Sequence, residues 1–216
     1  MEMGRRDLED LLGQVDEVLD LDDDARRRRV VDELVAELET RFGPELSGEL
    51  AYLTGYLLYQ RPGGAELSEK MERLFVRAAQ GADEDTVARS SLYLGHVAYD
   101  QRDYYLAKER FALVQENELH DFLRTKLLEM RACCHLRLRE LPQFLASLEV
   151  LVVTAEGLPI EDVCPQNLAA GLEEASLAEA RGSRAALLSL ARRLDAAAGF
   201  EDWISERMES SLLRAR

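Results

Sequence analysis

Apolar residues recur along most of the chain at spacings of three and four residues, which is the period of an amphipathic α-helix. Alternation with a period of two, which is typical of a half-buried strand, is nearly absent. The pattern is interrupted at Gly- and Pro-containing segments such as 43–44, 61–64 and 157–159, and at polar turns such as 102–103. The sequence therefore predicts an all-α protein built from helices of ordinary length.

These breaks divide the chain into a series of expected helices joined by short loops. Asp85 and Ser183 stand where an N-cap belongs, because a short side-chain oxygen can accept a hydrogen bond from a free amide of the first turn. Short connections between helices favour antiparallel hairpins stacked side by side. The expected helices cover residues 6–19, 23–42, 45–60, 67–80, 84–101, 104–116, 119–139, 142–155, 166–181, 183–197 and 200–214.

Residues 94–111 (LGHVAYDQRDYYLAKERF) carry the clearest internal motif. Gly95 and Ala107 are small enough for two helices to cross closely, and Asp103 lies where the second helix begins. Phe111 follows Ala107 by four residues and can fill the space beside the next helix pair. This motif resembles the tetratricopeptide repeat, a helix–turn–helix unit of about 34 residues. The resemblance implies a right-handed α-solenoid of stacked helix pairs.

Small residues recur on both sides of this motif. With Gly95 as the reference, the comparable positions are Gly55, Cys134 and Ala175, at spacings of 40, 39 and 41 residues. The resemblance covers residues 90–114 as a motif and 45–197 as a layout. The family's Trp is replaced by Ser91 and its helix-ending proline is missing, so another kind of α-solenoid or a compact helical array stays an open alternative. The expected second-helix counterparts of Ala107, Phe111 and Val114 are Met71, Phe75 and Ala78; Ala146, Val150 and Val153; and Leu187, Ala191 and Leu194.

The expected architecture is therefore a right-handed α-solenoid of about four antiparallel, tetratricopeptide-like helix pairs, with capping helices at both ends. We expect a single helical-repeat domain over residues 1–216, with N-terminal capping helices over 1–44, the helix pairs over 45–197 and a C-terminal capping helix over 198–216. Caps are expected because the end faces of a solenoid are otherwise exposed. The apolar stripe of the last helix, which includes Trp203, could instead pair with a second chain, so a homodimer is an open alternative.

In a tetratricopeptide array the first helix of each pair lines the concave surface, and the resemblance implies a groove rich in Tyr at that surface. Five of the seven Tyr fall there. Tyr offers a large contact area with a polar tip, and Arg offers forked donors to carboxylates. The alternative is that half of these Tyr pack between helices. The candidate partner-binding residues are Tyr52, Tyr56, Tyr59, Arg89, Tyr93, His96, Tyr99, Arg131, His135 and Arg139.

The net charge of the chain indicates which classes of partner it could bind. The chain has 27 Lys and Arg against 42 Asp and Glu, which gives a net charge of −15. Such acidity argues against binding to nucleic acid, which depends on cationic neutralisation of phosphates, and against binding to anionic membrane surfaces. No secretory signal pattern follows the first Arg pair, and three Cys do not form a disulfide framework. We therefore expect a cytoplasmic protein whose partner is another protein.

Patterns that carry chemistry are incomplete in this sequence. Residues 20–24 (DLDDD) begin like a calcium loop, but Ala25 and Val31 stand where the loop needs Gly and Glu. The donors of residues 133–135 (CCH) are adjacent on one helix and point about 100° apart, so they do not converge on one zinc ion. Glycine-rich phosphate-binding motifs are also missing. We therefore expect no metal, no cofactor and no enzymatic activity.

Three functional hypotheses remain. The first is a non-catalytic interaction module or adaptor that holds a peptide or helix of a partner protein in the Tyr-rich groove. The second is an acidic inhibitor or immunity-type protein that neutralises a basic toxin or enzyme, for which opposite charge would accelerate association. The third is a secretion or assembly chaperone that uses the same groove for its client.

Overall fold

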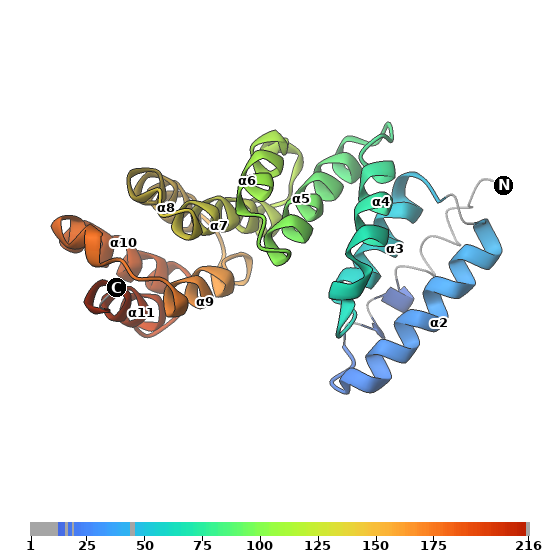
Figure 1. The fold of residues 1–216 in the computed structure, drawn as a ribbon, viewed down its shortest axis with the longest axis horizontal. Helices are drawn as coiled ribbons and strands as arrows, with labels where there is room; N and C mark the ends of the chain where they lie inside the picture. The colour runs from blue at the N-terminus through green and yellow to red at the C-terminus, as the bar shows by residue number, and fades with distance from the viewer. Residues whose placement is uncertain (1–12, 16, 19, 44–45, 215–216) are drawn as a thin grey trace. The chain divides into compact units, whose positions relative to one another are not determined.

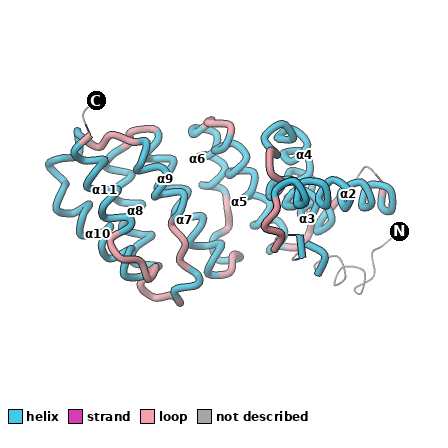
Figure 2. Tube along the Cα trace, turned by 90° about the horizontal axis from the view of Figure 1, so that it is seen from below, coloured by secondary structure: helices cyan, strands magenta, loops and turns pink. Residues whose placement is uncertain are grey.

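The computed structural model describes residues 13–15, 17–18, 20–43 and 46–214, and from residue 20 onward these residues form ten α-helices, α2 to α11, four short 3₁₀ helices and no strand (Figure 1). The expected all-α class is confirmed. Loops between the described helices are short (Figure 2). The expected helix over residues 6–19 lies largely outside the described residues, although 13–15 and 17–18 are helical.

The chain divides into two compact units, Met1–Gln101 (unit 1) and Arg102–Arg216 (unit 2). The motif of residues 94–111 spans this division, so its first helix belongs to unit 1 and its second to unit 2. That the two units act as one repeat domain stays a prediction. Each unit is described below by itself.

Unit 1 contains four described α-helices. α3 and α4 form a hairpin joined by a short 3₁₀ turn, α2 packs on α3, and α5 packs on both helices of the hairpin. The bounds are α2 (Asp24–Phe42), α3 (Gly48–Gln60), η1 (Gly64–Leu67), α4 (Ser68–Ala78) and α5 (Glu84–Asp100).

Two helices of unit 1 begin with an aspartate cap. Asp23 accepts a hydrogen bond from the Arg26 amide at 2.5 Å, and Asp83 accepts one from the Thr86 amide at 2.8 Å. The expected cap at Asp85 was therefore wrong by two residues, because the carboxylate that precedes the first turn is that of Asp83. Each cap satisfies one of the free amides in the first turn of its helix.

The hairpin of unit 1 closes around Gly55. A Cβ atom at this position would lie 2.9 Å from the Phe75 ring, so only glycine permits the observed approach of α3 and α4. Phe75 is itself fully buried, together with Leu57 and Val31. The expected small residue at Gly55 is confirmed, and its partner is an aromatic ring rather than a second small residue.

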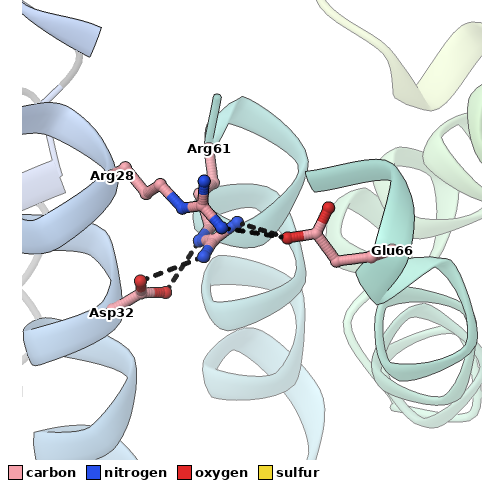
Figure 3. A network of polar contacts seen from close by, with 4 residues as sticks. All are labelled: Arg28, Asp32, Arg61 and Glu66. Carbon is pink, nitrogen blue, oxygen red and sulfur yellow. Dashed lines mark hydrogen bonds and ion pairs between the residues drawn. The ribbon is translucent and has the colours of Figure 1, made fainter. Parts of the chain in front are cut away.

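Arg61 joins three segments of unit 1 (Figure 3). Its guanidinium donates to both carboxylate oxygens of Asp32 on α2, at 2.7 and 3.0 Å, and to Glu66 of η1 at 3.1 Å. The Arg61 side chain is only 7% exposed, whereas Arg28, which also reaches Glu66, is half exposed. The bidentate pair therefore fixes α2 against the end of α3.

Unit 2 contains six α-helices. α7 packs against α6, α8 and α9, while α10 packs against α8 and α11 packs against α9 and α10. The bounds are α6 (Tyr104–Leu113), η2 (Glu116–Glu118), α7 (Asp121–Arg137), α8 (Leu141–Ala155), η3 (Ile160–Asp162), α9 (Gln166–Glu174), η4 (Ala178–Ser183), α10 (Arg184–Ala197) and α11 (Trp203–Leu213).

The second helix of each expected pair buries the same positions, counted from its N-cap residue. Buried side chains stand four, eight and eleven residues after the N-cap in α4, α6, α8 and α10. In α8 these are Phe144, Leu148 and Leu151. The expected set of Ala146, Val150 and Val153 was therefore wrong by two residues and lies on the exposed face of α8.

The fourth expected pair departs most from its predicted form. α9 ends at Glu174 rather than continuing to residue 181, because Ala175 is extended and its carbonyl accepts a hydrogen bond from the Ser211 hydroxyl at 2.9 Å. The Leu177 amide in turn donates to the Ser211 carbonyl at 2.9 Å. The expected small residue at Ala175 was wrong, since a Cβ at Gly171 would lie 3.2 Å from Leu136 and marks the close approach of α9 to α7.

Two buried carboxylates supply the caps that α9 and α11 lack. α9 begins after Pro165, which has no capping side chain, and Glu129 of α7 accepts from the Leu168 amide at 2.9 Å. At the start of α11, Asp195 accepts from the amides of Ile204 and Ser205 at 2.7 and 2.9 Å. Ser183, the other expected cap, precedes α10 but makes no capping hydrogen bond with its side chain. Capping in unit 2 is therefore partly tertiary.

Candidate functional site

Aromatic side chains of α3, α4 and α5 gather around Tyr93 in unit 1. The ring centroid of Tyr93 lies 5.2 Å from that of Tyr56, 5.3 Å from Tyr59 and 5.5 Å from both Phe75 and His96. The contacts with Tyr56 and Tyr59 are edge-to-face, the arrangement that the ring quadrupole favours. We call Tyr52, Tyr56, Tyr59, Phe75, Tyr93 and His96 the tyrosine cluster.

The cluster has a buried part and an accessible part. Tyr52 and Tyr93 are 5% and 9% exposed, so both pack between helices, as the alternative interpretation of the sequence expected. Tyr56 and Tyr59 of α3 are half-buried, and so is Tyr99 near the end of α5. Only the half-buried tyrosines retain surface that a partner could cover.

Burial raises the pKa of three phenols in this cluster. It raises the pKa of Tyr52 to about 12, although the neighbouring Arg89 guanidinium opposes this shift. The pKa of Tyr93 is raised well above its usual value, chiefly by burial. Burial also raises the pKa of Tyr59, and the hydrogen bond that its hydroxyl donates to the Asp100 carboxylate adds to the shift. The tyrosine hydroxyls therefore serve as donors and acceptors at neutral pH.

Arg89 is already engaged within unit 1. Its guanidinium lies 4.4 Å from the centroid of the Tyr52 ring and pairs with Asp85 at 2.7 Å and with Glu49 at 3.2 Å. Glu49 also accepts from the Thr86 hydroxyl at 2.5 Å. The expected groove arginine thus joins the start of α5 to the start of α3 and stacks on a buried ring.

A cavity of about 320 Å³ opens beside the cluster, within unit 1. Tyr59 and Asp100 meet at this cavity, the phenol donating to the carboxylate. Burial raises the pKa of the Asp100 carboxyl, although the Tyr59 hydrogen bond opposes the shift. Its lining consists of Tyr59, Gly64, Ser68, Met71, Val97, Asp100 and Gln101.

Three candidate residues belong to unit 2. Arg131 donates to the Phe111 carbonyl at 3.0 Å and pairs with Glu116 at 2.8 Å, so it ties α7 to the end of α6. His135 lies 2.6 Å from Glu140 through Nδ1. Arg139 was expected on a helix but lies in the α7–α8 turn, exposed and with φ at 58°, because α7 ends at Arg137.

Glu140 is the acceptor at which several of these groups meet. Lys108 of α6 donates to both of its oxygens, at 2.7 and 3.0 Å, and His135 contacts one of the same oxygens, Oε2, at 2.6 Å. The hydrogen bonds from Lys108 and then from His135 hold the pKa of Glu140 below its usual range. This cluster stabilises the start of α8 and the packing of α6, and its charges are balanced internally.

The structure brings together six candidate residues of unit 1, namely Tyr52, Tyr56, Tyr59, Arg89, Tyr93 and His96, and places Arg131, His135 and Arg139 in unit 2. The role of all ten in partner binding stays a prediction. Sequence reasoning missed Asp100 and Met71 of the cavity. Asp100 follows His96 by four residues on the same helix, so helical spacing alone would have placed it on the face of the candidate tyrosines.

Three other features of the described residues bear on function: metal-ligating groups, cysteines and apolar helices. Among the described residues, no three His, Cys, Asp or Glu side chains are grouped as metal ligands. Cys133 and Cys134 are fully buried, and burial raises the pKa of the Cys134 thiol to about 12. No helix in the described part of the chain has both the length and the apolar character needed to span a membrane.

Comparison of the chain with models of protein families, with curated proteins and with solved structures gives no match. The resemblance to the tetratricopeptide repeat therefore stays a prediction that depends on residues 94–111 and on the arrangement of the helices.

Proposed function

We propose that this protein is a non-catalytic interaction module that binds a peptide or helix of a partner protein on the α3–α5 face of unit 1. We further propose that its helix pairs form a tetratricopeptide-like α-solenoid, which the burial pattern shared by α4, α6, α8 and α10 supports. The proposed setting is the cytoplasm. No nucleic acid, membrane or cofactor is required.

One observation carries the proposal: two half-buried tyrosines, Tyr56 and Tyr59, pack on a buried aromatic base, and Tyr59 also lines a cavity. Tyrosines held in this way offer a contact surface that loses little side-chain entropy on binding. The buried base of Tyr52, Phe75 and Tyr93 keeps their rings in place. A rigid aromatic surface with polar tips is typical of protein recognition sites.

The test is capture of a partner from a native lysate with the full chain. Tyr56→Ala/Tyr59→Ala is expected to lose the captured partner, because it removes the accessible part of the cluster. Tyr105→Ala is the matched control, since Tyr105 is 65% exposed on α6 and lies outside the cluster. A partner that both variants retain equally would contradict the proposal, provided that circular dichroism shows both to be folded.

A second candidate function has one observation in its favour. Residues 1–101 contain 23 Asp and Glu against 12 Lys and Arg, a net charge of −11, whereas residues 102–216 contain 19 against 15, a net charge of −4. An acidic inhibitor of a basic protein would use such a surface to accelerate association. In that case the association rate should fall steeply with salt, and Tyr56→Ala/Tyr59→Ala should leave it unchanged.

A further inference from the structure

We propose that the cavity between Tyr59 and Asp100 receives a lysine or arginine side chain of the partner protein. The inference rests on the proposed function, because it names the group by which a bound peptide would be anchored. In this arrangement the carboxylate of Asp100 would pair with the charged head group, and the other residues that line the cavity would contact the methylene groups of the side chain.

Asp100 is a carboxylate without a cation. In the described part of the chain no Lys or Arg lies within ion-pair distance of it, and its hydrogen-bond partner is the neutral hydroxyl of Tyr59. Other carboxylates at helix contacts are paired, as Glu49 is with Arg89 and Glu140 with Lys108. Asp100 is exposed at the end of α5 and lines the cavity, so a cation that enters the cavity can reach its carboxylate.

The walls of the cavity suit the stem of such a side chain. Met71 and Val97 contribute apolar surface, and the ring of Tyr59 stands beside the carboxylate to which its hydroxyl donates. Lysine and arginine bury their methylene groups against apolar surface while the charged head seeks an acceptor. A cavity of about 320 Å³ has room for one such side chain together with water.

Charge around the cavity has the matching sign. Unit 1 carries a net charge of −11 over residues 1–101, so its field attracts cations and repels anionic groups. A positively charged anchor also agrees with the neutral tyrosine hydroxyls nearby, which can accept hydrogen bonds from an ammonium or guanidinium group. An acidic or purely apolar anchor would leave the Asp100 carboxylate unpaired.

The probe is a short Gly/Ser peptide with a single central lysine, titrated into the ¹⁵N-labelled full-length protein and followed by NMR. Saturable shifts are expected at amides near Met71, Val97 and Asp100, with the arginine peptide behaving alike. Peptides that carry acetyl-lysine or norleucine at the same position should bind at least about tenfold more weakly, a difference of about 1.4 kcal/mol. Equal shifts with all four peptides would overturn the proposal.

Variants separate a local site from general electrostatic attraction. Asp100→Asn should weaken binding of the lysine peptide about tenfold, whereas Glu84→Gln should change it less than twofold. Both remove one charge from α5, but Glu84 begins the helix and Asp100 ends it, roughly 24 Å away. Equal losses in the two variants would mean that only net charge matters and would overturn the proposal.

Two further measurements keep the test decisive if Asp100→Asn fails to fold. Gln101→Lys places a cation at the edge of the cavity and should reduce binding of the lysine peptide, whereas Gln101→Glu should not. If peptide binding behaves as expected but no lysate partner depends on Tyr56 and Tyr59, the cavity site stands and the proposed function fails. If a Tyr-dependent partner is captured equally by wild type and Asp100→Asn, the proposed function stands and this inference fails.

Discussion

Unit 1 buries a cation, Arg61, whereas unit 2 buries two carboxylates, Glu129 and Asp195. The cation is satisfied by side chains, since Asp32 and Glu66 reach it from α2 and η1. Asp195 is satisfied by two backbone amides at the start of α11, whereas Glu129 accepts from the Leu168 amide of α9 and pairs with the Lys126 ammonium at 2.9 Å. Each unit thus uses its buried charge at the place where its helices leave polar groups unpaired.

Part of the contrast follows from how two helices of each unit begin. In unit 1, α2 and α5 carry their own caps in Asp23 and Asp83. In unit 2, α9 follows a proline and α11 follows Asp202, whose backbone is left-handed and whose side chain does not cap the helix. At the starts of α9 and α11, a carboxylate from a neighbouring helix supplies the acceptor that the local sequence lacks.

The units also differ in their buried tyrosines, and the largest expected effect is the dependence of the stability of unit 1 on high pH. Above pH 10 the tyrosines of an unfolded chain ionise, but the pKa of Tyr52 is about 12 and that of Tyr93 is higher still. The folded state then binds more protons than the unfolded state, so the free energy of unfolding falls as pH rises. The loss is about 3 kcal/mol per pH unit for the pair.

Two intrinsic probes can follow this transition. Tyrosinate absorbance reports mainly on unit 1, which holds five of the seven Tyr, and fluorescence reports on unit 2, which holds the single Trp at Trp203. Unit 1 is expected to lose its structure at a lower pH than unit 2, and Tyr93→Phe should move its transition upward. Coincident transitions would show that the contrast between the units does not extend to their stability.

The next effect concerns the buried acceptors of unit 2. Asp195→Ala leaves the amides of Ile204 and Ser205 without an acceptor and should reduce the free energy of unfolding by about 3 kcal/mol. Urea denaturation followed by Trp203 fluorescence measures the change. Glu201→Ala is the control, because Glu201 is exposed just before α11. A loss below about 1 kcal/mol would mean that water replaces the carboxylate.

Arg61→Met tests the buried charge of unit 1. The substitution keeps apolar volume but removes three hydrogen bonds, and because Asp32 and Glu66 are about half exposed, solvent recovers part of their energy. We expect a loss of about 2 kcal/mol, measured by urea denaturation with tyrosine detection. Arg28→Met should cost less than about 0.5 kcal/mol, since surface pairs contribute little. Equal losses of unfolding free energy in the two variants would show that the buried Arg61 pairs contribute no more to stability than the exposed Arg28 pair.

The smallest expected effect concerns the cap of α5. Asp83→Ala should cost about 1 kcal/mol, and Asp85→Ala should cost less, because only Asp83 accepts the Thr86 amide. Hydrogen bonds from Thr86 lower the pKa of Asp83, so this stabilisation is present above the ordinary aspartate pKa and is lost as pH falls through the lowered one. Thermal unfolding at neutral and acidic pH measures both changes. A larger loss for Asp85→Ala would contradict this expectation and would indicate that Asp85 is the N-cap, as the sequence predicted.

Helix positions could be predicted from the sequence because apolar periodicity and Gly/Pro breaks are local signals. The buried positions of α8 were predicted wrongly because they were counted from Cys134. The spacing that the second helices of this chain share is counted from the N-cap residue of each helix. The end of α9 at Glu174 could not be foreseen, since it depends on Ser211, far along the chain. Local sequence patterns do not predict contacts between residues that are far apart in the chain.

The candidate site was partly predictable for the same reason. Spacing along α3 and α5 places the tyrosines on one face, and the structure brings them together. Spacing does not tell which of them the neighbouring helix covers, so the burial of Tyr52 and Tyr93 required the packing of α4 and α5. Asp100 was missed because acidic residues are too frequent in this chain for one of them to stand out.

The two tertiary caps also share a direction along the chain. Glu129 precedes α9, and Asp195 precedes α11. A ribosome therefore makes each acceptor before it makes the amides that the acceptor will receive, and the helix that holds the carboxylate emerges first. As α9 and α11 leave the exit tunnel, each can begin on a helix that is already synthesised, so assembly of unit 2 can proceed in the order of translation.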